Sequence, residues 1–94
     1  MDGVIEELWA VIEDRQERRP EGSYTASLLD GETDDSPLEK LGEESTELLL
    51  AAADGDGEEV AAEAADVVYH LLVVLADSDA DLDDLRAELE RRRR

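Results

Sequence analysis

Apolar residues recur at helical spacing in four separate segments of this chain, and that periodicity limits what the chain can fold into. The expected helices cover about residues 2–18, 36–53, 57–77 and a short segment from 81 onward. No segment alternates apolar and polar residues as a half-buried strand would. The pattern therefore predicts an all-α fold of four helices. At 94 residues, the chain 1–94 is expected to form a single domain.

Residues that commonly begin helices lie just ahead of these segments. Ser36 stands three residues before Glu39, which is the spacing of a capping box. Asp56 and Asp81 stand at the N-cap positions of the third and fourth expected helices. The stretch Glu21–Asp35 shows no helical or strand period, so we expect a loop there.

Two of the expected helices carry apolar residues on both faces. At 100° per residue, Leu50 lies opposite Leu41 on the second helix, and Val73 lies opposite Ala64 on the third. Four short helices from one chain cannot easily cover both faces of each. We therefore expect a helical bundle that is completed by a homodimer.

The charge of the chain excludes several kinds of partner. Its 28 acidic and 9 basic residues give a net charge of −19. Such a field repels phosphate backbones and anionic lipids, so we expect neither nucleic acid nor a membrane as partner. The longest uncharged run, Val67–Ala76, is too short to cross a bilayer, and the acidic first residues do not fit a signal peptide. We expect a cytoplasmic protein.

The basic residues are also of an unusual kind, because Lys40 is the only lysine and the rest are arginine. Hydrophobic residues make up 41% of the chain, which is too many for a disordered acidic tail. A folded chain with many carboxylates and almost no lysine resembles proteins of salt-loving archaea. We therefore expect its folding to depend on salt. With no cysteine, disulfides and thiolate zinc sites are excluded.

Two pairs of carboxylates are candidates for a metal site. Glu44 and Glu47 lie on the second expected helix, and Glu63 and Asp66 lie on the third, each pair at one edge of the apolar stripe. If the two helices pack antiparallel across the short turn between them, these edges face each other. Such an oxygen-rich site suits Mg²⁺, with Mn²⁺ as an alternative. In a chain this acidic the same spacings also arise on solvated faces, so a non-catalytic acidic helical interaction module stays open.

Other polar residues accompany these carboxylates. Lys40 lies at the same edge of the second helix, Glu43 is next to the candidate ligands on that helix, and His70 lies at the acidic edge of the third. A histidine on a helix is more often a packing residue than a catalyst. In the expected loop, three consecutive hydroxyl residues can bind a ribose or a phosphate; they are Ser23, Tyr24 and Thr25.

Taken in order, three blocks resemble the phosphoribosyl-ATP pyrophosphohydrolase family, the second enzyme of histidine biosynthesis. The blocks are Ser23–Thr25, Lys40–Glu47 and Glu63–Val73. The E-x-x-E and E-x-x-D patterns are shared with the wider MazG-like all-α nucleoside triphosphate pyrophosphohydrolases. The S-Y-T block and the Tyr-His pair after E-x-x-D are more specific to this family. The similarity covers nearly the whole chain and implies the four-helix MazG-like fold with dimer contacts.

The resemblance also implies an activity and roles for residues. The activity is Mg²⁺-dependent hydrolysis of phosphoribosyl-ATP to phosphoribosyl-AMP and pyrophosphate. The implied metal ligands are Glu44, Glu47, Glu63 and Asp66. The implied catalytic residues are Glu43 for activating water, Lys40 for a phosphate and His70 for orientation or donation. The implied substrate-binding residues are Ser23, Tyr24, Thr25 and Arg15.

One stretch departs from the family pattern. Just before its second helix the family commonly has basic residues, where this chain reads Asp34-Asp35-Ser36. Phosphate contacts from that stretch are therefore not expected. The chain also lacks the partner domain that many organisms fuse to this activity, so we expect the stand-alone form. A general house-cleaning nucleoside triphosphate pyrophosphatase with the same metal motif is the alternative enzyme.

Overall fold

The computed structural model describes residues 3–31 and 36–93, which form five helices and no strand. The helices are α1 (Val4–Arg18), α2 (Tyr24–Asp30), α3 (Pro37–Asp54), α4 (Gly57–Ala76) and α5 (Leu82–Arg92). The expected all-α fold is thereby confirmed, and four of the helices lie where the apolar periodicity places them. Residue 2, the expected start of the first helix, lies outside the described residues.

The predicted helix starts have the expected caps. The Ser36 hydroxyl accepts a hydrogen bond from the Glu39 N–H (3.1 Å), and Asp56 accepts from two N–H groups in the first turn of α4. Asp81 forms a reciprocal capping box with Asp84 at the start of α5. These bonds satisfy backbone donors that have no partner within the helix, so helix boundaries here follow directly from local sequence.

The expected loop Glu21–Asp35 is wrong in part, because α2 lies inside it. Ser23 caps this helix by accepting from the Ala26 N–H (3.1 Å), and Gly31 ends it in a left-handed conformation (φ 71°). Thr25 and Leu28 are buried. Seven residues hold too few apolar side chains to show a helical period, and tertiary packing supplies the stability that the segment lacks alone.

The core lies where α1 and α5 pack against the C-terminal half of α4. Its buried members are Ile12, Leu72, Val73 and Leu82. Partly buried hydrophobic residues surround them, among them Trp9 and Tyr69. The Gln16 side chain also donates to the Ala76 carbonyl (2.8 Å), which ties α1 to the end of α4.

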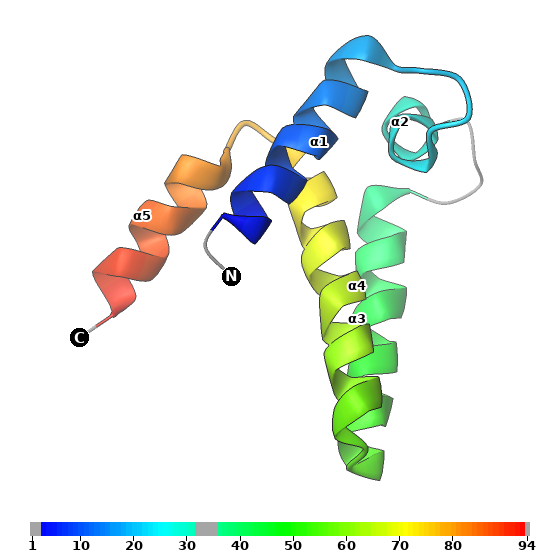
Figure 1. Cartoon of the computed structure of the whole chain (residues 1–94), viewed down its shortest axis with the longest axis vertical. Helices are drawn as coiled ribbons and strands as arrows, with labels where there is room; N and C mark the ends of the chain where they lie inside the picture. Colours follow the sequence, from blue (N-terminus) through cyan, green and yellow to red (C-terminus); the bar gives the residue numbers. More distant parts are fainter. Residues whose placement is uncertain (1–2, 32–35, 94) are drawn as a thin grey trace.

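Helices α3 and α4 form a long antiparallel hairpin, whose far end extends away from α1, α2 and α5 (Figure 1). Both helices were expected to have two apolar faces, and the second face is covered on α4 but exposed on α3. Val73 is fully buried within the chain, so the second face of α4 is covered at that point. On α3, by contrast, three leucines are exposed: Leu38 (71%), Leu49 (70%) and Leu50 (61%). Within the described residues, no helix is long and apolar enough to cross a membrane.

Candidate metal centre

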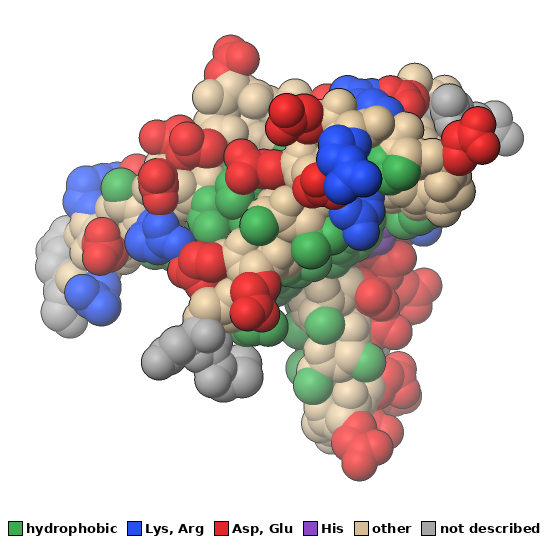
Figure 2. Space-filling view, turned by 45° about the horizontal axis from the view of Figure 1, so that its top comes forward, with side chains coloured by type: hydrophobic (Ala, Val, Ile, Leu, Met, Phe, Trp, Pro, Cys, Tyr) green, Lys and Arg blue, Asp and Glu red, His purple; other side chains and the backbone are tan. Residues whose placement is uncertain are grey.

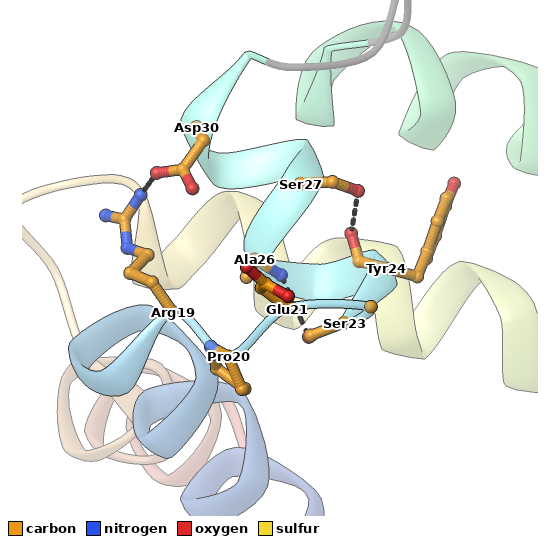
Figure 3. Close-up of a pocket in the computed structure, with 9 residues that line it drawn as sticks. Arg19, Pro20, Glu21, Ser23, Tyr24, Ala26, Ser27 and Asp30 are labelled. Carbon is orange, nitrogen blue, oxygen red and sulfur yellow. Dashed lines mark hydrogen bonds and ion pairs between the residues drawn. The ribbon is translucent and has the colours of Figure 1, made fainter.

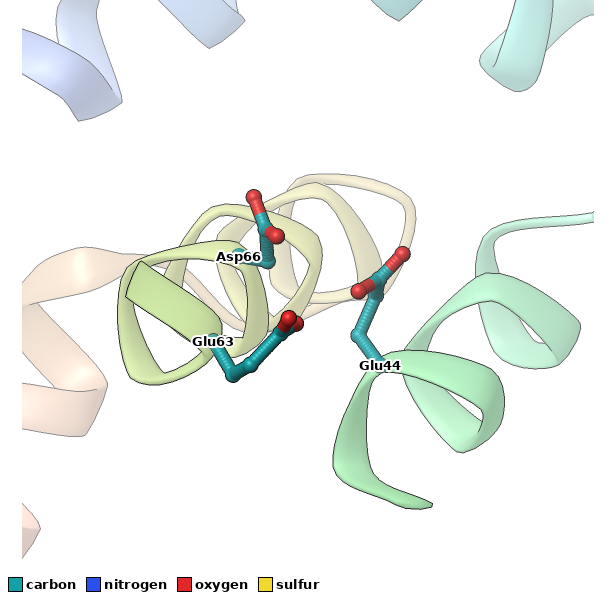
Figure 4. A group of neighbouring side chains, drawn as sticks. All are labelled: Glu44, Glu63 and Asp66. Carbon is teal, nitrogen blue, oxygen red and sulfur yellow. The ribbon is translucent and has the colours of Figure 1, made fainter. Parts of the chain in front are cut away.

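The α3–α4 hairpin brings three carboxylates together. Glu44 extends from α3, Glu63 and Asp66 lie on α4, and oxygen atoms of the three lie within 4.8 Å of one another (Figure 4). Glu63 and Asp66 are one helical turn apart and therefore lie on the same side of α4. The antiparallel register places Glu44 opposite them. The predicted convergence of the two acidic edges is thus observed for three of the four expected ligands.

The electrostatics of this group favour a bound cation. Partial burial, followed by the charges of Asp66, Glu44 and Glu47, raises the pKa of Glu63 above its ordinary value. Each of these effects opposes a negative charge on Glu63, and a divalent ion would relieve all of them. Three carboxylate oxygens without a thiolate match the donor preference of Mg²⁺ and Mn²⁺. The residues present therefore fit a hard divalent cation.

Glu47, the fourth expected ligand, is not a member of this close group, although its charge contributes to the raised pKa of Glu63. Its side chain is exposed one turn along α3 from that of Glu44. Lys40 lies beside the group, with Nζ 3.3 Å from a Glu43 oxygen and 3.7 Å from a Glu44 oxygen. The only lysine of the chain is therefore held at the edge of the candidate metal centre.

His70 lies one turn beyond Asp66 on α4 and is 5% exposed. Burial, the largest effect, lowers the pKa of its imidazole below the ordinary value, although the charges of Glu44 and Asp66 act in the opposite direction. Its Nδ1 atom is buried without a hydrogen-bond partner among the described residues. The imidazole is consequently neutral near pH 7 and next to the acidic group.

The two motifs that are most specific to the resemblance contact each other. The Thr25 hydroxyl and the Tyr69 hydroxyl share a hydrogen bond, and the Tyr24 and Tyr69 rings both meet His70 edge to face, with centroids at 6.3 and 4.8 Å. Thr25 was expected to bind substrate, but it is buried and bonded to α4. Its pairing with Tyr69 was not anticipated from the sequence. The sequence feature that could have indicated this contact is the presence of both the S-Y-T block and the Tyr-His pair in one chain.

Ser23 and Tyr24 border an open hollow of about 460 Å³ beside the loop that joins α1 to α2 (Figure 3). The Ser23 oxygen already accepts the cap hydrogen bond of α2, and its hydroxyl proton remains a donor. Arg15 lines a second hollow, of about 340 Å³, that shares this loop. Its guanidinium is 2.5 Å from an Asp14 oxygen. The expected substrate-binding residues thus lie around one corner, apart from Thr25.

Comparisons with known proteins match nearly the whole chain to one family. The family model described as phosphoribosyl-ATP pyrophosphohydrolase matches residues 5–93. A phosphoribosyl-ATP pyrophosphatase of Haloarcula marismortui is 63% identical over 91 residues, which cover 96% of this chain and 93% of that protein. One from Halobacterium salinarum is 59% identical over 95 residues, covering 99% of this chain and all of that protein.

More distant relatives bear the same name. A phosphoribosyl-ATP pyrophosphatase of Methanocella arvoryzae is 45% identical over 95 residues, which cover both proteins completely. The similarity therefore extends from the first helix to the last. On this evidence, the chain belongs to the phosphoribosyl-ATP pyrophosphohydrolase family.

Proposed function

We propose that this chain hydrolyses phosphoribosyl-ATP to phosphoribosyl-AMP and pyrophosphate, the second step of histidine biosynthesis. Its relatives over the whole chain bear the name phosphoribosyl-ATP pyrophosphatase. The observation that carries the proposal is the close group formed by Glu44, Glu63 and Asp66 across two helices. A triphosphate can approach a chain of net charge −19 only where a cation offsets the repulsion.

The proposal assigns Mg²⁺, with Mn²⁺ as an alternative, to these three carboxylates. Glu47 joins them as a fourth ligand after a rotation of its exposed side chain. The ion, when bound, supplies positive charge to the phosphate oxygens and makes water a stronger acid. The chain's own contribution is to hold several carboxylates in one place on a rigid hairpin.

Three further residues complete the proposed chemistry. Glu43 is exposed on α3 next to Glu44, and there it orients and deprotonates the attacking water. Lys40, held between Glu43 and Glu44, binds a phosphate oxygen as a point charge. His70 is neutral, so it donates one hydrogen bond without adding charge, either to the substrate or to a ligand carboxylate.

We also propose that the protein acts as a homodimer. The exposed leucines of α3, Leu38, Leu49 and Leu50, lie on the hairpin that carries the metal ligands. Burial of a leucine side chain contributes roughly 2 kcal/mol, so covering all three would stabilise an assembly considerably. The same leucine face on a second copy of the chain can cover these side chains, and a second copy is present wherever the protein is.

The experiment that tests the function is pyrophosphate release in molar KCl, with and without Mg²⁺, from phosphoribosyl-ATP and from dATP and dUTP. We expect turnover of phosphoribosyl-ATP only, and only with Mg²⁺. Glu44→Gln and Glu63→Gln should lower kcat by at least about a hundredfold and remove the Mg²⁺-dependent rise in melting temperature. Glu90→Gln, on α5, serves as the matched control and should behave as the wild type.

The other outcomes separate the alternatives. Turnover of dATP or dUTP instead would make this a house-cleaning pyrophosphatase with the same metal centre. No turnover by folded protein, together with a higher melting temperature in Glu63→Gln and no response to Mg²⁺, would favour the non-catalytic interaction module. In that case the carboxylates of the acidic group would repel one another without binding a cation.

A further inference from the structure

Three arginines gather at the corner where α1 meets α2. Arg15 and Arg18 lie in the last turn of α1, and Arg19 is its C-cap residue. Of the nine basic residues in the chain, five lie from Arg86 onward and Lys40 lies beside the metal centre, which leaves these three. Figure 2 shows Lys and Arg side chains near the α1–α2 end of the molecule and, separately, over α5, with acidic side chains along the hairpin.

These arginines border two hollows that share one loop. Arg19 lines the hollow of about 460 Å³, whereas Arg15 and Arg18 line the one of about 340 Å³. Both hollows share the loop residues 20–23, where Ser23 adds a hydroxyl. An anion in the larger hollow would therefore meet Arg19, and one in the smaller hollow would meet Arg15 and Arg18, with the Glu21 carboxylate at the edge of both.

Carboxylates hold the guanidinium groups in place. Asp14 accepts from Arg15 (2.5 Å) and from Arg18 (3.3 Å), and Asp30 of α2 forms an ion pair with Arg19 (Figure 3). The Arg19 Nε also donates to the Gln16 carbonyl (2.5 Å). A guanidinium has five N–H donors in a planar fork, so these contacts orient each group and leave it able to bind a phosphate as well.

A short chain of contacts joins this corner to the candidate metal centre. Tyr24 lines the larger hollow, and its ring extends away from Arg19 and Asp30 to meet His70 edge to face. The charges of Glu44 and Asp66 in turn act on His70. Tyr24 and His70 therefore link the larger hollow to the surroundings of the acidic group.

We propose that this arginine corner binds the phosphate monoester at the far end of phosphoribosyl-ATP, an inference that rests on the proposed function. That substrate has a triphosphate at one end and a ribose 5-phosphate on the other side of its adenine. The metal neutralises only the triphosphate. In an acidic chain the ribose 5-phosphate needs positively charged side chains to bind it. Nucleoside triphosphates have no such second phosphate and would lack this contact with the arginines. Arg18 and Arg19 thereby determine specificity, together with Arg15.

A purely structural role makes a different prediction. Cations in the last turn of a helix stabilise it through the helix dipole, and the Arg19–Asp30 pair joins α1 to α2. If that were all, Asp30→Asn and Arg19→Gln would act in the same direction, since each breaks the pair. If Arg19 binds substrate, Asp30→Asn instead releases its guanidinium and strengthens phosphate binding.

The test measures inhibition of the Mg²⁺-loaded protein by phosphoribosyl-AMP, which carries the distal phosphate, and by AMP, which lacks it. Molar KCl confines charge effects to near contact, with a Debye length of about 3 Å. For Arg18→Gln and for Arg19→Gln we expect the inhibition constant of phosphoribosyl-AMP to rise about tenfold and that of AMP to change less than about twofold. Asp30→Asn should lower the constant of phosphoribosyl-AMP. Arg86→Gln, on α5, is the matched control and should leave both unchanged.

Equal changes for the two inhibitors, or no change beyond that of Arg86→Gln, would overturn the proposal. So would an Asp30→Asn variant that weakens binding as Arg19→Gln does. Arg18 keeps the test independent of folding, because its side chain is 70% exposed and its ion pair lies within α1. Failure of the proposed function looks different, since the wild type itself would then not turn over phosphoribosyl-ATP.

Discussion

At the scale of single residues, burial decides what His70 can do. Two influences on its imidazole conflict, because the surrounding carboxylates favour the charged form and burial favours the neutral one. Burial is the larger influence, so the pKa is lowered. The rings of Tyr24 and Tyr69 are among the groups that cover the imidazole, which they meet edge to face. A neutral histidine beside an acidic group is thus a product of packing.

This lowered pKa predicts how stability depends on pH. Unfolded His70 takes up a proton as pH falls below its ordinary pKa of 6.5, whereas the folded residue resists protonation. The stability that His70 contributes is therefore present above pH 6.5 and is lost as pH falls toward 5. We expect the free-energy advantage of the wild type over His70→Asn to shrink in this range by at most about 1.4 kcal/mol per pH unit. Chemical unfolding in molar KCl at several pH values measures it, and a constant advantage would contradict the prediction.

At the scale of helices, α2 shows how a segment without a period of its own becomes ordered. Its caps, Ser23 and Gly31, are local, but seven residues do not form a stable helix in isolation. Burial of Leu28 and the hydrogen bond between Thr25 and Tyr69 attach α2 to the rest of the molecule. The Thr25 hydroxyl is thus bonded to α4, whereas Ser23 and Tyr24 line the hollow.

This attachment is measurable as a coupling free energy. Thr25→Val and Tyr69→Phe each remove one hydroxyl and leave the other without its partner, so each should lower the free energy of unfolding by about 1 kcal/mol. The double variant should lose little more than either single one, which gives a coupling of about 1 kcal/mol. Chemical unfolding of the four proteins in molar KCl completes the cycle. Additive losses would mean that the two hydroxyl groups act independently.

At the scale of the whole molecule, charge and apolar exposure act against each other. A net charge of −19 on 94 residues favours expansion, and the exposed leucines of α3 favour association. Salt screens the first effect and strengthens the second. The gain of helical structure and the association into a dimer should therefore occur over the same range of rising KCl concentration.

Sedimentation velocity and circular dichroism across a KCl series test this expectation. In molar KCl we expect a folded dimer, and in dilute buffer we expect loss of both the helical signal and the dimer mass. The double variant Leu49→Asp, Leu50→Asp should remain helical in molar KCl and sediment as a monomer, because only the exposed face of α3 is changed. Leu89→Asp on α5, where the side chain is 59% exposed, is the matched control and should leave the dimer intact. A monomeric wild type, or a circular dichroism signal that salt does not alter, would contradict the prediction.

Much of this protein follows from its sequence by itself. Helix boundaries depend on caps and periodicity within a few residues, so Ser36, Asp56 and Asp81 predict where three helices start. Residues one turn apart on a helix lie on one side, so the pairing of Glu63 with Asp66 follows from spacing alone. The family resemblance, carried by three blocks, also required no structure and is confirmed by the comparisons.

Tertiary structure decided the rest, because it depends on contacts between residues far apart in the chain. Only the register of α3 against α4 brings Glu44 to Glu63 and leaves Glu47 outside the close group. Periodicity gives Val73 and Leu50 the same expectation, since each lies on the second apolar face of its helix. Val73 is buried and Leu50 is exposed because α1 and α5 cover only part of the hairpin. The arginine corner exists because α2 returns past the end of α1, an arrangement that local sequence does not specify.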